Sequence, residues 1–277
     1  MGGRLEGKVC IITGASRGLG QYCAIGYAKE GATVVVAART EQETDPRLPG
    51  TIHHTATLVN ENGGEAFPVA CNVANQDSVD AMVKKVLDRY GRIDVLMTNA
   101  GVQPPGSVST IQIKHWELEF RINVHGAFYC IRAALPSLLE RGRGSIVTIS
   151  SLAADHGGSH YGATKRAIES TTLGLAAEVR DQGVAVNCLK PVASIETPGM
   201  LFGGRPAAKT PPPDSYVEAA VILARMTPET GTGIVMNDAQ IIARFADEAT
   251  QDRFRKLNGE AWKAALDAAT ASSPGTA

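Results

Sequence analysis

The sequence predicts a single α/β domain built on a doubly wound, parallel sheet of seven strands. Short, apolar, β-rich segments alternate with helical segments along most of the chain, a pattern typical of parallel strands joined by crossover helices. Several of the apolar segments have no polar face, as expected for strands that helices cover on both sides. The chain has 277 residues, which is within the size range of one large α/β domain.

The strands are predicted at residues 9–13, 33–38, 66–71, 93–98, 145–150, 185–190 and 233–237. The helices are predicted at 21–30, 52–62, 78–90, 114–140, 160–181 and 214–226. Residues 1–246 form the main domain in this prediction. A last helix at 247–268 carries Phe254, Leu257, Trp262 and Leu266 along one side and packs on the domain or on a neighbouring subunit. The end, 269–277, is small and polar and is predicted to be disordered.

The bulk composition argues against several classes of protein. A formal net charge of −1 gives no indication of a nucleic-acid or polyanion partner. The five cysteines are scattered without a C-x-x-C pair, which indicates reduced thiols in a cytoplasmic protein. The N-terminus lacks the apolar core of a signal peptide, and no apolar run is long enough to span a membrane. His53 and His54 are adjacent but lack a third ligand, so no metal site is predicted.

A glycine-rich turn follows the first predicted strand. It contains Gly14, Gly18 and Gly20, and a predicted helix begins directly after it. Glycines let the backbone turn tightly and approach a pyrophosphate closely, while the helix N-terminus supplies N–H donors. The spacing is G-x-x-x-G-x-G and not the more common G-x-G-x-x-G. A simple turn is the alternative, but the position straight after a first strand favours a dinucleotide site.

Tyr161 and Lys165 are one helical turn apart, so on a helix their side chains lie on the same face. A free tyrosine keeps its proton to about pH 10, and a nearby ammonium group favours the phenolate. Such a pair can give and take a proton near neutral pH. A half-buried tyrosine beside a solvated lysine has the same spacing, so the neighbouring motifs decide between the two interpretations.

A series of motifs occurs in an order that points to one family. They are Thr13-Gly14-Ala15-Ser16-Arg17-Gly18-Leu19-Gly20, Asn72-Val73, Asn99-Ala100-Gly101, Asn123, Ser150-Ser151, Tyr161-x-x-x-Lys165 and Pro191. Over residues 5–240 the chain resembles the short-chain dehydrogenase/reductase family, in its common single-domain branch. The long insert at 40–58 and the segment 233–242, in place of a Gly-Gly ending, resemble a hydroxysteroid-dehydrogenase-like side branch. The resemblance implies that residues 1–246 form a Rossmann fold that binds a dinucleotide and carries the catalytic site.

The resemblance also implies the catalytic roles. Tyr161 would exchange a proton with the substrate oxygen, and Lys165 would support it and bond the nicotinamide ribose. Ser151 would hold the substrate oxygen and stabilise developing charge. Ser150 is the alternative, because the ten residues from Ser151 to Tyr161 make a short loop for this family. Asn123 would hold a water that links Lys165 to solvent, or else it is an ordinary polar residue of a long helix.

The cofactor contacts follow from the same resemblance. They are Gly14, Ser16, Arg17, Gly18, Leu19, Gly20, Arg39, Thr40, Asn72, Val73, Asn99, Ala100, Gly101, Tyr161, Lys165, Pro191 and Thr197. NAD enzymes usually carry an acid at the end of the second strand, but Ala38 and Arg39 stand there in this chain. Arg39 and Arg17 suit a 2′-phosphate, which predicts NADP(H) over NAD(H). The alternative is that both are surface arginines with carboxylate partners. Val192 follows Pro191 where the family usually has glycine, which leaves the path of the 191–215 loop open.

The predicted function is NADP(H)-dependent interconversion of a secondary alcohol and a ketone or aldehyde, as in short-chain alcohol dehydrogenases and carbonyl reductases. Segment 193–215 is expected to cover the pocket, and its Ile195, Met200, Leu201 and Phe202 suggest a medium-sized or bulky apolar substrate. The alternatives are a regulatory protein that binds dinucleotide without turnover, and a lyase or epimerase that uses the same tyrosine.

The predicted helices at 114–140 and 160–181 carry more apolar side chains than one side of a sheet requires. The family commonly pairs these helices across a two-fold axis, so a homodimer or homotetramer is expected. His156 and His160 flank Tyr161 in the sequence and are expected to be loop residues rather than catalysts.

Overall fold

The computed structural model describes residues 2–156, 159–204 and 212–257. Within these residues, seven parallel strands form one sheet in the order β3-β2-β1-β4-β5-β6-β7, which confirms the predicted fold class. The strands are β1 Val9–Thr13, β2 Thr33–Ala38, β3 Glu65–Ala70, β4 Val95–Thr98, β5 Gly144–Ile149, β6 Val184–Lys190 and β7 Val235–Asn237. The strand order reverses between β1 and β4, and doubly wound sheets bind their ligands at this switch point.

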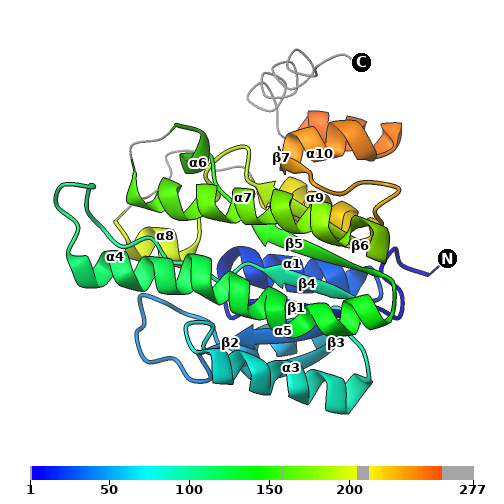
Figure 1. The fold of residues 1–277 in the computed structure, drawn as a ribbon, viewed down its shortest axis with the longest axis horizontal. Helices are drawn as coiled ribbons and strands as arrows, with labels where there is room; N and C mark the ends of the chain where they lie inside the picture. The colour runs from blue at the N-terminus through cyan, green and yellow to red at the C-terminus, as the bar shows by residue number, and fades with distance from the viewer. Residues whose placement is uncertain (1, 157–158, 205–211, 258–277) are drawn as a thin grey trace.

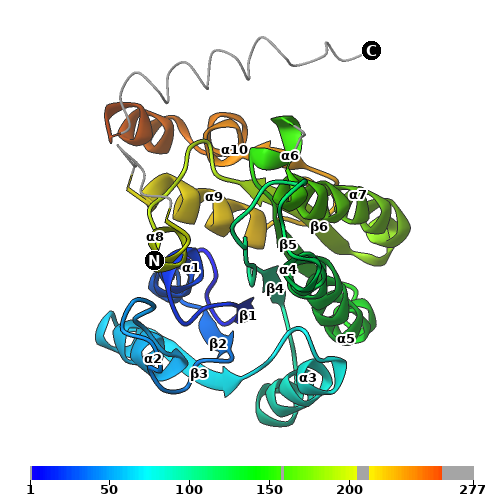
Figure 2. The same ribbon diagram turned by 90° about the vertical axis from the view of Figure 1, so that its left-hand side faces the viewer.

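Helices cover both faces of the sheet (Figure 1). One face carries α1 Gly18–Lys29, α2 Ile52–Glu61 and α9 Asp214–Ala224. The other face carries α3 Gln76–Tyr90, α5 Ala127–Glu140 and α7 His160–Val179. Figure 2 shows the two helical layers with the sheet between them. No helix in the described ranges has both the length and the apolar character needed to cross a bilayer.

Strands β1 to β6 contribute side chains to two apolar cores, one on each face. Cys10 and Ile12 of β1 join the core beneath α1 and α9, whereas Val9 and Ile11 join the core beneath α3 and α5. A strand covered on both faces needs apolar residues at successive positions, which explains the unbroken apolar runs of the sequence. All five cysteines are buried.

The single α-helix predicted at 114–140 changes its winding in the middle, so that prediction is wrong there. The segment consists of α4 Ile113–Phe120, a π-helical stretch η1 Arg121–Gly126, and α5. Gly126 of η1 packs closely on the loop after β3, since a Cβ at Gly126 would lie 2.9 Å from Val73 Cγ2. Short π-helical stretches inside α-helices occur frequently at functional sites, and this one contains Asn123.

Three helices of the described residues have no counterpart among those predicted. They are α6 Ala153–His156, α8 Pro198–Phe202 and α10 Asp238–Phe245. The last two start at capping residues rather than at an apolar period, because the side chains of Thr197 and Asn237 accept backbone N–H groups. Residues 248–257 are also helical, with Phe254 fully buried. The rest of the helix predicted at 247–268 and the tail 269–277 lie outside the described residues.

Candidate active site

The glycine-rich turn after β1 packs against the segment after β4 at the switch point. Gly14 and Gly18 have φ angles of +66° and +59°, which glycine adopts far more readily than other residues. A Cβ on Gly14 would lie 2.7 Å from Ala100 Cα, and a Cβ on Gly20 would lie 2.5 Å from Asn99 Nδ2. Larger residues at these two positions would therefore push the segments apart.

Side-chain hydrogen bonds connect the glycine-rich turn with the segment after β4. Asn99 Nδ2 donates to the carbonyl oxygens of Thr13 at 2.9 Å and Gly14 at 3.3 Å. Ala100 N donates to Thr13 Oγ1 at 3.1 Å. Arg17 is the N-cap residue of α1, and its side chain has no oxygen with which to cap the helix. The N–H groups of the first turn therefore suit an anionic ligand.

The insert after β2 folds back onto the glycine-rich turn. Arg17 Nε donates to the carbonyl oxygen of Pro49 at 2.9 Å, and Arg17 Nη2 donates to that of Gly50 at 2.7 Å. Burial and the positive charge of Arg39 lower the pKa of Arg17, while the carboxylate of Glu43 acts in the opposite direction. The two guanidinium groups are therefore close enough to repel each other, so a polyanion bound between them would be stabilised by both.

Arg39 and Thr40 lie at the carboxyl end of β2, next to the glycine-rich turn. Arg39 is exposed, and it lines an open hollow with Thr40, Glu41, Gln42, Thr44 and His53. In doubly wound folds the adenosine ribose binds beside this strand end. The hollow contains both the predicted phosphate ligand Arg39 and an acidic neighbour, Glu41.

Lys165 is buried beside Tyr161 in the first turns of α7. Lys165 Nζ donates to the carbonyl oxygen of Ile149 at 2.9 Å and lies 5.4 Å from the centroid of the Tyr161 ring. Only 3% of Lys165 is exposed. Burying an ammonium group costs free energy unless the charge has partners, and the carbonyl oxygen of Ile149 and the Tyr161 ring are partners of this one. Ser159 fixes the start of α7 by accepting from Gly162 N at 2.8 Å.

Asn123 connects Lys165 with the segment after β4. Asn123 Oδ1 accepts from Val102 N at 2.8 Å, and Asn123 Nδ2 donates to Val102 O at 2.9 Å and to Thr164 Oγ1 at 3.1 Å. A Cβ on Gly101 would lie 3.4 Å from Asn123 Oδ1 and 3.6 Å from Lys165 Nζ. Three motifs that are distant in the sequence thus meet at one point.

The two serines after β5 differ in burial and in their partners. Ser150 is buried, and its Oγ donates to Glu169 Oε1 at 2.7 Å. Ser151 is half-buried, and its Oγ accepts from Ala153 N at 3.2 Å. Because Glu169 uses the hydroxyl proton of Ser150, Ser151 is the better candidate to donate to a substrate oxygen.

An ion pair holds the short loop between Ser151 and Tyr161. Lys190 Nζ, at the end of β6, contacts both carboxylate oxygens of Asp155 on α6, at 2.7 and 2.8 Å. It also lies 3.5 Å from Glu169 Oε1. The pair therefore fixes α6 to the carboxyl end of β6.

Thr197 reaches the glycine-rich turn from the loop after β6. A Cβ on Gly18 would lie 3.2 Å from Thr197 Cγ2, so the two residues are in van der Waals range. Thr197 Oγ1 accepts from Met200 N at 3.3 Å and caps α8. The start of α8 therefore lies directly beside the glycine-rich turn.

One buried carboxylate joins the backbone after β6 to the start of α9. Asp238 Oδ1 accepts from Val192 N at 2.5 Å, and Asp238 Oδ2 accepts from Ser215 Oγ at 2.6 Å. Burial raises the pKa of Asp238, and the two hydrogen bonds act against this. Val192, which stands where the family usually has glycine after Pro191, is thus anchored through its backbone.

The remaining predicted contacts lie along the same edge of the sheet. Asn72 follows β3, where its N–H donates to Ser78 Oγ at 2.9 Å and its Oδ1 accepts from Ala74 N at 3.2 Å. Ser16 is buried, and Leu19 packs partly buried on the core beneath α1. Apart from Asn123, which lies in η1, the predicted site residues therefore follow the carboxyl end of a strand or lie in the first turns of α1 or α7.

His160 differs from its predicted place. The sequence suggests a loop residue, but His160 is the first residue of α7 and is buried. Its Nδ1 lies 2.6 Å from Glu119 Oε2 on α4, and its Nε2 lies 3.0 Å from the carbonyl oxygen of Gly106. Glu119 is 41 residues away in the chain, so no local pattern reveals this pair.

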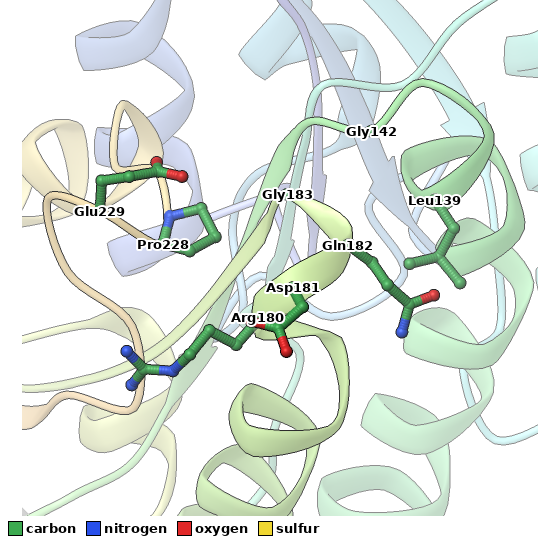
Figure 3. A pocket seen from close by; sticks show the side chains of 8 residues that line it. All are labelled: Leu139, Gly142, Arg180, Asp181, Gln182, Gly183, Pro228 and Glu229. Atoms are coloured by element: carbon green, nitrogen blue, oxygen red, sulfur yellow. The ribbon is translucent and has the colours of Figure 1, made fainter.

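A second open hollow lies at the opposite edge of the sheet (Figure 3). It is lined by Leu139, Gly142, Arg180, Asp181, Gln182, Gly183, Pro228 and Glu229. Gly142 and Gly183 precede β5 and β6, so this hollow lies at the amino ends of these strands, away from Tyr161. Within the described ranges, no group of three His, Cys, Asp or Glu side chains is placed to hold a metal ion.

Comparisons with known proteins agree with this geometry. The short chain dehydrogenase family profile matches residues 8–200. A 3-oxoacyl-(acyl-carrier-protein) reductase from Thermotoga maritima is 33% identical over 201 residues, which cover 70% of this chain and 77% of that protein. Hydroxysteroid dehydrogenase-like protein 2 from Xenopus laevis is 32% identical over 241 residues, which cover 84% of this chain and 57% of that longer protein.

A solved structure supports the same assignment. The crystal structure of a gluconate 5-dehydrogenase from Burkholderia cenocepacia, in complex with NADP and tartrate, matches with a TM-score of 0.74 at 27% sequence identity. The match covers 84% of this chain and 94% of that chain. Together with the profile match over residues 8–200, these similarities show that the chain belongs to the short-chain dehydrogenase/reductase family of NAD(P)-dependent oxidoreductases.

Proposed function

We propose that the chain is an NADP(H)-dependent enzyme that interconverts a secondary alcohol and a ketone or aldehyde. The observation that carries the proposal is the buried ammonium group of Lys165, 5.4 Å from the centroid of the Tyr161 ring. This pair lies at the sheet edge that also holds the glycine-rich turn and Ser151. A proton-transfer group, a group that binds substrate oxygen and a dinucleotide cradle are the parts such a reaction requires.

The residues at the switch point fit a nicotinamide dinucleotide. Gly14 and Gly20 leave no room for a Cβ between the turn and the Asn99-Ala100 segment, so the backbone itself forms the cradle. The first turn of α1 offers N–H donors for the pyrophosphate, and Lys165 is placed to hold the ribose. When bound, the nicotinamide supplies or accepts the hydride.

The protein residues move the proton. In the reductive direction the Tyr161 hydroxyl gives its proton to the carbonyl oxygen, and in the oxidative direction Tyr161 takes it back. The ammonium group of Lys165, 5.4 Å from the centroid of the Tyr161 ring, supplies positive charge beside this residue. Ser151 donates to the same substrate oxygen and holds it near Tyr161. Asn123 keeps Val102 and Thr164 in place behind Lys165.

We further propose a medium-sized or bulky apolar substrate. Leu201 and Phe202 of α8 are each 48% exposed, although both are large and apolar. Exposed apolar side chains beside a candidate site favour an apolar ligand. The relatives include a 3-oxoacyl reductase and a gluconate dehydrogenase, whose names indicate different substrates. The proposed substrate class is therefore based on the exposed apolar residues of α8 and not on the family.

A steady-state assay with NADPH and a panel of ketones and aldehydes, from small and polar to bulky and apolar, tests this function. We expect NADPH oxidation that is faster with the apolar members, and the reverse reaction with the corresponding alcohols. Dinucleotide binding without turnover of any panel member would contradict catalysis and favour the regulatory alternative. A product with the oxidation state of the substrate would favour a lyase or epimerase.

Arg39→Ala is expected to raise the Michaelis constant for NADPH far more than that for NADH. A charge-assisted hydrogen bond contributes about 1.5–3 kcal/mol, so the Michaelis constant for NADPH should rise about tenfold to hundredfold. Initial rates with both cofactors measure the effect. Arg225→Ala, a change at an exposed arginine that ends α9, is the matched control and should change neither constant. An equal rise for both cofactors in Arg39→Ala would show that Arg39 does not contact the 2′-phosphate.

A homodimer or homotetramer is the assembly that we propose. Four large apolar side chains on α4, α5 and α7 are exposed, namely Ile113, Leu118, Phe128 and Leu173. An isologous contact between these helices would cover the same patch on both subunits. Light scattering at micromolar concentration should report at least a dimer, and a fully active species with the monomer mass of 29.1 kDa would contradict the proposal.

A further inference from the structure

A buried histidine–glutamate pair lies directly before Tyr161 in the chain. His160 is 2% exposed and Glu119 is 0% exposed. Three segments meet at the imidazole ring: α7 through His160 itself, α4 through Glu119, and the loop after β4 through Gly106. Helices α4 and α7 also pack against each other. The ring therefore joins the helix that carries Tyr161 to two other parts of the site.

The partners of the imidazole determine where its protons lie. A carbonyl oxygen only accepts, so Nε2 of His160 carries a hydrogen and donates to Gly106 at 3.0 Å. Two lone pairs 2.6 Å apart would repel each other, so another proton lies between Nδ1 and Glu119 Oε2. The pair is then imidazolium with carboxylate, or imidazole with carboxylic acid. Its net charge is zero in both forms, which allows both groups to be buried.

The bond to Gly106 tethers the loop that leads from β4 to α4. This loop begins at Asn99 and includes Gly101, which packs against Asn123 and Lys165. Gly106 has a φ of +126°, and a Cβ there would lie 3.1 Å from Ile111 Cα, so the backbone bends sharply at the tethered carbonyl. The bond from Ser107 N to Thr110 Oγ1 stays within the loop, whereas the bond from His160 spans 54 residues.

We propose that His160 is a positioning residue for Tyr161, and that together with Glu119 it fixes the loop at 102–112 against the first turn of α7. This inference rests on the proposed function, in which the substrate oxygen lies between Tyr161 and Ser151. Loss of the tether changes the position of that oxygen relative to the Tyr161 hydroxyl. In the proposed function the glycine-rich turn after β1 and Lys165 hold the dinucleotide, and the tether from His160 to Glu119 and Gly106 includes neither of them, so the affinity for the dinucleotide does not depend on the tether.

Three variants test the proposal: His160→Ala, Glu119→Ala and Glu119→Gln. A glutamine amide at position 119 donates to Nδ1 of a neutral imidazole while Nε2 still donates to Gly106, so Glu119→Gln keeps the tether. We expect both alanine variants to lower kcat about tenfold to hundredfold, the scale of a small misplacement of reacting groups. Glu119→Gln should restore kcat to near the wild-type value. The affinity for NADPH should be unchanged in all three variants.

Melting temperatures and NADPH titrations of the same samples separate positioning from loss of fold. Wild-type kcat in His160→Ala contradicts the proposal, and so does a Glu119→Gln variant as slow as Glu119→Ala. A fall in kcat that parallels a fall in NADPH affinity shows a purely structural role and also contradicts it. Tyr161→Phe, measured alongside, tests the proposed function by itself. Retained activity there overturns the function, whereas an inactive Tyr161→Phe with a fully active His160→Ala overturns only this inference.

Discussion

Tyr161→Phe is expected to lower kcat by about two orders of magnitude or more, the usual contribution of a positioned acid–base group. Phenylalanine keeps the ring 5.4 Å from Lys165 Nζ, but it has no hydroxyl group with which to exchange a proton with the substrate oxygen. The affinity for NADPH should stay near the wild-type value, because the glycine-rich turn and Lys165 are unchanged. Steady-state rates and a fluorescence titration with NADPH measure the two quantities separately.

Tyr90→Phe is the matched control for this change. Tyr90 ends α3, and its hydroxyl group contacts Glu65 at 3.1 Å, at the amino end of β3. The control removes the same atom at the opposite edge of the sheet, so kcat should be unaffected. Near-full activity in Tyr161→Phe would show that another group transfers the proton, and equal losses in both variants would indicate a general effect of hydroxyl removal.

The parts of the site that could be predicted from the sequence are encoded in short, contiguous motifs. The glycine-rich turn can be recognised because a predicted strand precedes it and a predicted helix follows it. The Tyr161–Lys165 pair can be recognised because one helical turn separates the two residues. Parallel strands place their carboxyl ends at one edge, so motifs that follow successive strands must converge. The fold class therefore follows from the alternation of strands and helices, whereas the strand order that creates the switch point comes from the structure.

Long-range contacts between aperiodic segments could not be predicted in this way. Glu119 meets His160 across 41 residues, and Asp238 meets Val192 across 46 residues. In each case one partner belongs to a loop end or a helix end, where no apolar period marks a position as buried. The sequence shows that such residues can carry charge, but only the packing of the helices shows which charges are enclosed.

For Arg17, part of the role could be predicted from the sequence and part could not. Its position in the glycine-rich turn is clear from the sequence, and its charge suggests a phosphate contact. The structure adds that its guanidinium group donates to the carbonyl oxygens of Pro49 and Gly50. The insert that supplies these oxygens lacks a periodic pattern, so its return to the turn is a tertiary effect that spacing does not encode.

Gly20→Ala is expected to weaken NADPH binding strongly, because the added Cβ has no space. It would lie 2.5 Å from Gly14 O, 2.5 Å from Asn99 Nδ2 and 2.9 Å from Ala15 Cα. Two of these atoms belong to the backbone, so no side-chain rotation relieves the clash. Overpacking of this kind costs about 1–3 kcal/mol, which corresponds to about a tenfold to hundredfold rise in Kd if the turn is displaced in the bound state.

Gly174→Ala is the control that separates this steric effect from the general effect of replacing a helical glycine. Gly174 lies in α7, and a Cβ there would meet nothing within 4 Å. Replacing glycine by alanine in an unstrained helix stabilises a protein by about 0.4–1 kcal/mol, so Gly174→Ala should bind NADPH normally and melt at or above the wild-type temperature. Gly20→Ala should bind NADPH weakly and melt lower. Normal NADPH binding in Gly20→Ala would mean that the contact between the turn and Asn99 is not needed to shape the cradle, and the dinucleotide site would then have to lie elsewhere on the sheet edge.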